Sequence, residues 1–196
     1  GPSEILVVAD THADAGFIAA DLLSQAEHDA LSSAILVCTS REQAASVENE
    51  LLGQLAQLPR KQIAEKSLDA YGAIFVVSDL NAAMALANRI APEHLELQVE
   101  APFEWLSSVK NAGAVFLGAY TPEPVGDYVA GPNHVLPTGG TARFSSALSV
   151  DCFMKQSSVI YYSQEAFVRD SGFITALAET EGLSAHAESI RKRLGQ

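Results

Sequence analysis

The feature that most constrains the fold is a regular alternation between short apolar runs and longer segments with helical spacing. The apolar runs have the length and composition of buried strands. We predict strands at residues 4–9, 34–39, 73–78, 95–99, 114–117 and 157–162. We predict helices at residues 13–28, 41–58, 80–90, 103–109 and 145–155, and two more within 164–193 that separate near Gly182. Strands that alternate with helices form parallel sheets covered on both faces, so the pattern predicts an α/β fold.

The predicted architecture is a mostly parallel, doubly wound sheet of an incomplete Rossmann-like kind, with a C-terminal helical extension. We expect residues 1–145 to form an α/β domain that carries the metal and acid/base residues. Residues 146–196 should form a C-terminal strand and a helical dimerisation extension. The two terminal helices have an apolar side that a partner subunit would cover. This side includes Phe167, Ile174, Leu177, Leu183 and Ile190.

The charge of the chain restricts its partners. A net charge of -12 and a pI near 4.7 argue against nucleic acid, because phosphate binding needs a basic surface. A small cationic substrate would be attracted by the negative electrostatic field of such an acidic chain. No apolar run approaches the ~20 residues of a membrane helix, and no leader pattern precedes the first strand, so we expect a cytoplasmic protein. The chain opens directly on a strand without an initiator Met, which suggests a piece of a longer polypeptide.

Several familiar motifs are absent. The chain has no G-x-G-x-x-G turn between strand and helix, no P-loop and no G-x-S-x-G elbow. A zinc hydrolase is disfavoured because H-E-x-x-H is also missing. Cys38 and Cys152 lack metal-site spacing, and we expect both to be buried and inert thiols.

Residues Gly118 to Gly140 interrupt the alternation. This stretch contains four prolines and five glycines and is too long for an ordinary connection. The glycines permit close backbone approach and the prolines restrict the conformations available. We therefore predict an ordered binding loop, in which Asp127 and His134 are the candidate functional side chains.

The dipeptide Glu93-His94 places a carboxyl group beside an imidazole where a helix should end. Pro92 disfavours helical conformation in the preceding residue, so the helix should end near Ala91. Glu93 and His94 then lie at the amino end of the next strand, whereas substrate pockets of doubly wound sheets lie at carboxyl ends. Two interpretations stay open: an acid/base pair, or a capped helix end with an exposed carboxylate.

Gln25 and His28 are three residues apart in a predicted helix and project from one face. They could hold a metal ion, or they could form a polar pair that faces solvent. His186 could likewise be a ligand or a helix-surface residue, and His12 is assigned no role. A zinc site of two His, one Asp and an amide oxygen is chemically reasonable, since zinc accepts nitrogen and oxygen ligands.

Six segments together resemble one family, histidinol dehydrogenase. The resemblance covers essentially all 196 residues and corresponds to roughly the carboxy-terminal half of a family member. The segments are Gly1-Pro2-Ser3-Glu4, residues 21–28, Pro92-Glu93-His94-Leu95, Gly126-Asp127-Tyr128, residues 131–138 and residues 181–186.

The resemblance implies oxidation of L-histidinol to L-histidine through the aldehyde, with two NAD reduced, as the last step of histidine biosynthesis. By this resemblance His94 would act as general base and Glu93 would activate water. The zinc ligands would be Gln25, His28, Asp127 and His186. The substrate contacts would come from Ser3, Gln25, His28, His94, Asp127, Glu181 and His186.

The resemblance also implies a domain-exchanged homodimer, in which Glu181 and His186 are donated to the partner's site. Most NAD contacts of the family come from a segment that would lie upstream of Gly1, so we assign no cofactor-binding residue to this chain. The chain by itself is expected to show little or no turnover. The alternative is a non-catalytic metal or small-ligand binding module, or a structural remnant.

Overall fold

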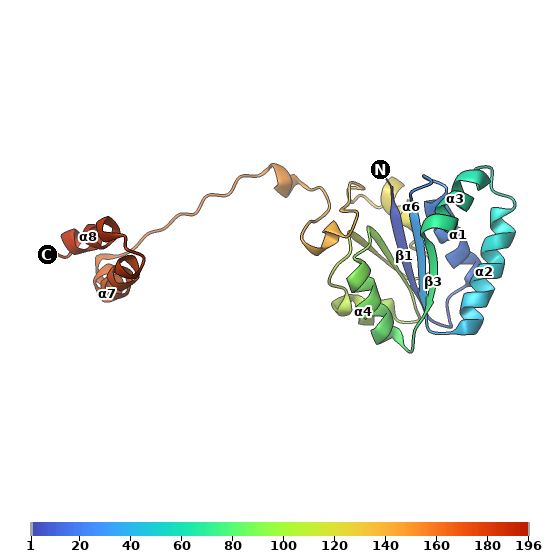
Figure 1. Ribbon diagram of the computed structural model, residues 1–196, viewed down its shortest axis with the longest axis horizontal. Coiled ribbons are helices and arrows are strands. Elements are labelled where there is room, and N and C mark those ends of the chain that lie inside the picture. The colour runs from blue at the N-terminus through green and yellow to red at the C-terminus, as the bar shows by residue number, and fades with distance from the viewer. Residues whose placement is uncertain (1, 196) are drawn as a thin grey trace. The chain divides into compact units, whose positions relative to one another are not determined.

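A computed structural model describes residues 2–195 of the chain. The chain divides into two compact units, Gly1–Phe153 and Met154–Gln196 (Figure 1).

The first unit is built on a five-stranded sheet in which every neighbouring pair is parallel. The strand order is β3-β2-β1-β4-β5. The predicted parallel α/β sheet is therefore confirmed. The strands are β1 (Glu4–Ala9), β2 (Ser33–Cys38), β3 (Gly72–Val76), β4 (His94–Gln98) and β5 (Ala114–Leu117).

Helices cover both faces of this sheet (Figure 1). On one face Ile5 and Val7 of β1 pack with Leu22 of α1 (Ala15–Ala26) and with residues of α2 (Arg41–Leu55) and α3 (Lys61–Tyr71). On the other face Leu6 and Val8 pack with α4 (Leu80–Ile90). The short helices α5 (Pro102–Trp105) and η1 (Leu106–Ser108) follow β4. Because successive β1 side chains point to opposite faces, each face buries its own apolar core.

Helix ends follow the local sequence. Asp14, Ser40 and Asp79 each accept a hydrogen bond from a backbone N–H in the first turn of α1, α2 and α4. Helix α4 ends at Ala91, which takes a left-handed conformation with φ of 56°. The predicted helix end before Pro92 is thus confirmed, and the following residues Glu93 and His94 turn back into the sheet.

Two helices were not predicted. Helix α3 lies beyond the end predicted for the second helix, since the chain turns at Pro59 and resumes helical structure at Lys61. Helix α6 (Glu123–Tyr128) lies inside the segment predicted as a loop. Pro122 and Pro124 read as loop residues in the sequence, yet proline is well accepted in the first turn of a helix.

Two predicted elements are wrong. Residues 145–155 form only the 3₁₀ turn η3 (Val150–Phe153), which follows η2 (Thr141–Arg143). Residues 157–162 are irregular and exposed, and no described strand pairs with them. Their apolar composition resembles a strand, but a strand without a partner leaves its backbone groups unpaired. Cys38 is buried as expected, whereas Cys152 is exposed.

The second unit contains α7 (Gln164–Thr180) and α8 (Ser184–Arg193). The predicted break near Gly182 is confirmed, and Gly182 has a φ of 74°. Ala178 and Ala187 are buried within this pair, while Phe173 and Leu177 are largely exposed. In the described part of the chain, no helix combines the length and apolarity that crossing a membrane requires.

Candidate active site

A stripe of polar side chains runs along β4. His94, Glu96 and Gln98 alternate with Leu95 and Leu97, which belong to the α4 core. All five residues are buried, so the alternation does not mark a face open to solvent. The three polar side chains point instead to the face where α1 lies, since Gln98 reaches Asp21 of that helix.

Glu93 and His94 are only 7% and 3% exposed. The interpretation of Glu93 as an exposed carboxylate at a helix end is therefore wrong. Sequence reasoning missed this burial because the cover comes from distant segments rather than from the neighbouring residues. The pair does lie at the amino end of β4, since His94 is the first residue of the strand.

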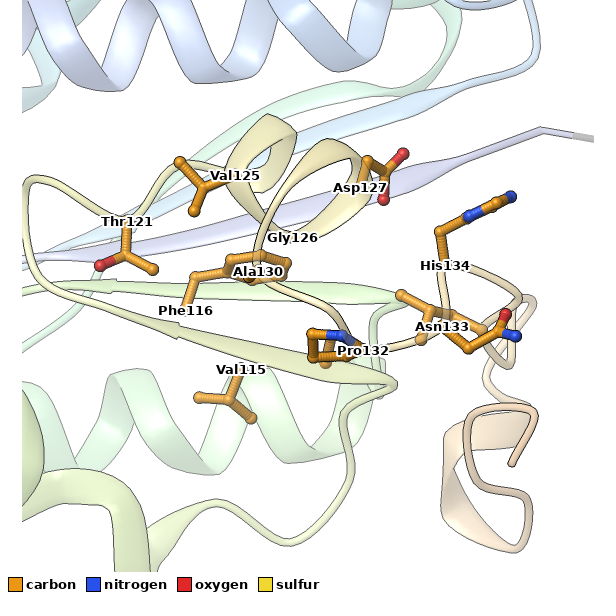
Figure 2. A pocket seen from close by; sticks show the side chains of 12 residues that line it. Val115, Phe116, Thr121, Val125, Gly126, Asp127, Ala130, Pro132, Asn133 and His134 are labelled. Carbon is orange, nitrogen blue, oxygen red and sulfur yellow. The ribbon is translucent and has the colours of Figure 1, made fainter. Parts of the chain in front are cut away.

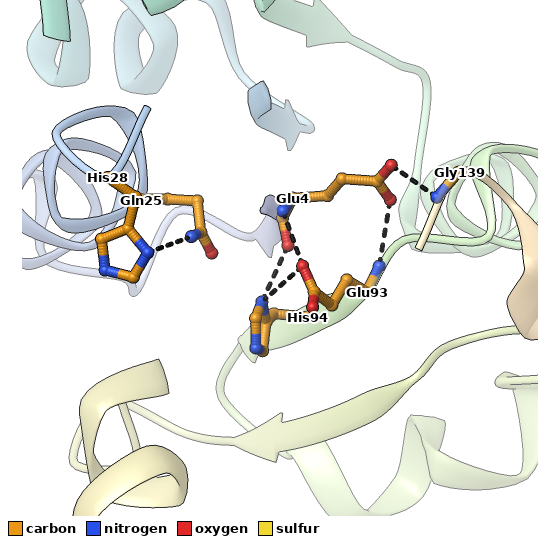
Figure 3. A network of polar contacts seen from close by, with 6 residues as sticks. All are labelled: Glu4, Gln25, His28, Glu93, His94 and Gly139. Atoms are coloured by element: carbon orange, nitrogen blue, oxygen red, sulfur yellow. Dashed lines mark hydrogen bonds and ion pairs between the residues drawn. The ribbon is translucent and has the colours of Figure 1, made fainter. Parts of the chain in front are cut away.

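The backbone of Glu4 orients both side chains (Figure 3). Its N–H donates to Glu93 Oε2 at 2.9 Å, and its carbonyl oxygen lies 2.9 Å from His94 Nδ1. A carbonyl oxygen can only accept, so Nδ1 carries the proton of the neutral ring. Nε2 is then an unprotonated nitrogen, and it is buried without a hydrogen-bond partner.

Burial shifts the pKa values of both Glu93 and His94 in directions that suit a general base. Desolvation, together with the charges of Glu4 and Asp127, raises the pKa of Glu93 to about 7. Desolvation lowers the pKa of His94, despite the hydrogen bond to Glu4. Near neutral pH the imidazole is therefore uncharged and the carboxyl is close to its midpoint. General bases work best with a pKa in this range.

Gln25 and His28 lie at the end of α1 (Figure 3). Gln25 Nε2 is 3.5 Å from His28 Nδ1. Gln25 is fully buried and His28 is exposed. Gln25 Oε1 has no partner, although a buried amide oxygen ordinarily accepts a hydrogen bond. An orphaned oxygen beside an imidazole is a donor pair that suits zinc.

Asp127 is presented by α6. This helix packs closely against β5, because a Cβ added at Gly126 would lie 2.7 Å from Phe116 Cε1. One polar atom from each of His94, Glu123 and Asp127 lies within 4.8 Å of the other two. Glu123 is buried and was missed by the sequence reasoning. The Pro-Glu-Pro run at residues 122–124, read as the first turn of a helix, is the signal that could have found it.

A largely apolar pocket of about 150 Å³ lies between β5, α6 and the following loop. Figure 2 shows Asp127 and His134 on the same side of this pocket. His134 is exposed, and Phe116 of the pocket wall lies 5.9 Å from the His94 ring, measured between ring centroids. The pocket therefore adjoins the acid/base pair.

The remaining predicted site residues are placed as follows. Ser3 is half-buried immediately before β1, where its carbonyl oxygen accepts from Ser33 N. Glu181 and His186 belong to the second unit, where both are exposed. The first unit thus contains Ser3, Gln25, His28, Glu93, His94 and Asp127.

Comparison with known proteins identifies the family. The family model for histidinol dehydrogenase matches residues 1–194. The chain belongs to the histidinol dehydrogenase family. The histidinol dehydrogenase of Moorella thermoacetica is 57% identical over 193 residues, which is 98% of this chain and 46% of the relative. That of Carboxydothermus hydrogenoformans is 55% identical over 99% of this chain and 46% of its own length.

A solved structure supports the same assignment. The crystal structure of histidinol dehydrogenase from Elizabethkingia anophelis matches with a TM-score of 0.91 and 41% identity. The match covers 100% of this chain and 45% of that chain. The chain therefore spans about half the length of the histidinol dehydrogenases that it matches.

Proposed function

We propose that this chain contributes the metal-binding and acid/base residues to an enzyme that oxidises L-histidinol to L-histidine through the aldehyde, with NAD as electron acceptor. The observation that carries this proposal is the buried His94 Nε2, which is left basic because Nδ1 faces the Glu4 carbonyl oxygen. A buried base without a partner suits removal of a proton from a bound alcohol.

Gln25, His28 and Asp127 would hold a zinc ion together with His186 of a partner subunit. The orphaned Gln25 Oε1 supports this, since a metal ion would supply the partner that the oxygen lacks. When bound, the ion would act as a Lewis acid that anchors the nitrogen atoms of the substrate. The acidic chain would favour binding of the cationic substrate.

His94 and Glu93 would move the protons. In the first oxidation His94 Nε2 would accept the hydroxyl proton of the substrate, while the carbon that bears this hydroxyl loses a hydride to NAD. When water adds to the aldehyde carbon, Glu93 would accept a proton from the water and protonated His94 would return its proton to the aldehyde oxygen. In the second oxidation the hydrated aldehyde would lose a hydride to a second NAD while His94 again accepts a hydroxyl proton, which gives the carboxylic acid. The protons held by Glu93 and His94 would then pass to solvent. The pKa of Glu93, about 7, suits this role near neutral pH.

The dinucleotide would be bound mostly by residues outside this chain, and no residue here is assigned to it. The enzyme would be a homodimer in which Glu181 and His186 reach the partner's site. Exposed apolar side chains such as Phe173 and Leu177 in α7 support an interface at the second unit.

The direct test is histidinol-dependent NADH formation by the enzyme with its full-length chain, comparing native protein with His94→Gln. We expect a loss of about 10²- to 10⁴-fold in kcat with zinc still bound. An unaffected rate would remove His94 from the mechanism. Zinc and histidinol binding without any turnover in the native enzyme would favour a binding module instead.

A further inference from the structure

Three buried carboxyl groups lie beside the site but have no part in the proposed chemistry. Asp21 of α1, Glu96 of β4 and Glu123 of α6 are 8%, 1% and 2% exposed. Burying carboxyl groups is destabilising, and apolar residues of similar volume would fill the same space more favourably. Three such groups on three elements therefore call for a reason other than packing.

Hydrogen bonds connect the three groups in one network. Gln98 Nε2 donates to Asp21 Oδ2 at 2.7 Å and to Glu96 Oε2 at 3.1 Å. The shared Gln98 amide therefore links the Asp21 and Glu96 carboxyl groups. Burial and the neighbouring charge of Asp21 raise the pKa of Glu96 to about 8. One end of this hydrogen-bond network therefore lies on β4, an inner strand of the sheet, and on α1.

The other end of this hydrogen-bond network lies beside Asp127. Glu96 Oε1 accepts from the backbone N–H of Glu123 at 2.9 Å. One carboxylate oxygen of Glu123 lies within 4.8 Å of one of Asp127, which is one turn further along α6. Helix α6 has six residues and no side-chain cap of its own, so the Glu96 carboxyl satisfies its first N–H group. Glu123 thus connects β4 with Asp127: its backbone N–H is bound by Glu96, and its side chain lies beside Asp127.

We propose that Glu96 and Glu123 are positioning residues that hold α6 on the sheet and hold Asp127 in the orientation from which it binds metal. This inference rests on the proposed function only for the assignment of Asp127 as a zinc ligand. Hydrogen-bonded partners of this kind commonly fix a carboxylate ligand and strengthen its binding. Neither residue touches the substrate in this account.

The test compares four variants of the chain. Glu96→Leu removes the acceptor of the Glu123 N–H, and Glu123→Leu removes the carboxyl group beside Asp127; both substitutions keep similar volume. Glu96→Gln and Glu123→Gln keep an acceptor for the Glu123 N–H or a donor for Asp127. Glu104→Leu, at an exposed position of α5, is the control. Two readouts are used: the zinc affinity by calorimetry with the metal alone, and hydrogen exchange of the amides of Glu123 and residues 125–128 in metal-free protein.

We expect each leucine variant to bind zinc about 10- to 100-fold more weakly and to exchange the α6 amides faster than the native chain. The glutamine variants should recover most of both properties, and Glu104→Leu should match the native chain. Unchanged α6 exchange in both leucine variants would overturn the inference, whether or not zinc binds. Failure of the native chain to bind zinc, with faster α6 exchange in the leucine variants, would contradict the zinc site and leave the positioning role supported.

Discussion

His94 Nδ1 lies 2.9 Å from the carbonyl oxygen of Glu4, across neighbouring strands of the sheet. This contact fixes which nitrogen of the ring is basic, because a backbone carbonyl oxygen can only accept a hydrogen bond, so Nδ1 keeps the proton. Since the carbonyl group belongs to the main chain of β1, the contact depends on strand pairing rather than on a replaceable side chain. The orientation of the base is therefore a property of the sheet.

The Glu4 side chain makes a separate set of contacts. Glu4 Oε1 accepts from Gly139 N at 2.8 Å, and Oε2 accepts from Glu93 N at 3.3 Å. We predict that Glu4→Ala lowers the free energy of unfolding by roughly 1–3 kcal/mol and accelerates proteolysis near residue 139, because two backbone donors lose a charged acceptor. The measurement is denaturant unfolding with limited proteolysis.

The control for Glu4 is Glu48→Ala, at an exposed position of α2, where the described structure shows no hydrogen bond or ion pair to the side chain. It should change stability little and leave cleavage near residue 139 as in the native chain. Equal cleavage in the Glu4 and Glu48 variants would show that the Glu4 carboxylate does not hold this loop.

Gly126 allows α6 to approach Phe116. A Cβ at this position would lie 2.7 Å from the ring, so Gly126→Ala must displace the helix or the ring. We predict a loss of stability of about 1–3 kcal/mol and weaker zinc binding, since Asp127 is the next residue. Gly53→Ala in α2 is the matched control, because nothing lies within 4 Å of its added Cβ. It should stabilise the chain by about 0.5–1 kcal/mol. Equal effects of the two substitutions would contradict the close packing of α6.

Glu96 should make stability fall as pH rises. Its pKa is about 8 in the folded chain against an ordinary value of 4.5, so the folded state binds the proton more tightly. The stability gained from this protonated group is complete below about pH 4.5 and is lost progressively toward pH 8. We predict a decrease on the order of 1–4 kcal/mol across this window in metal-free protein, and a smaller decrease in Glu96→Gln. Denaturant unfolding at pH 5 and pH 8 measures this decrease. An equal decrease in the native protein and in Glu96→Gln would show that Glu96 is not the group responsible.

Sharing of the site between subunits can be tested by mixing. In the full-length enzyme, His94→Gln and His186→Ala should each be nearly inactive alone. Subunit exchange would create hybrids with one native site, so about a quarter of native activity should return if His186 serves the partner. Mixtures that stay inactive after exchange would show that each subunit builds its own site.

The sheet was predictable because strands such as β1 and β2 carry their signal locally, in continuous apolar runs. The burial of Glu93 was not predictable, since it depends on contacts with residues far away in the sequence, such as Glu4. Residues 157–162 show the opposite error, because apolar composition predicts a strand even where the described chain offers no partner strand.

The site itself was predictable only in part. His94 and Asp127 were singled out from local features, a proline-bounded dipeptide and a glycine-rich loop. Glu96 was not, because nothing in the sequence distinguishes a buried glutamate in a strand from one on a solvent-facing side. Glu123 was not, because the Pro-Glu-Pro run was interpreted as part of a loop rather than as the first turn of a helix. Their contacts with Gln98, Asp21 and Asp127 exist only after β4, α1 and α6 have packed.

The most direct test of the account is a calorimetric titration of the metal-free chain with zinc, comparing the native protein with Asp127→Ala and Gln25→Leu. We predict binding of about one ion per chain in the native protein and a loss of at least about 10-fold in affinity in each variant. Native affinity in both variants, or no binding in the native chain, would contradict the proposed metal site.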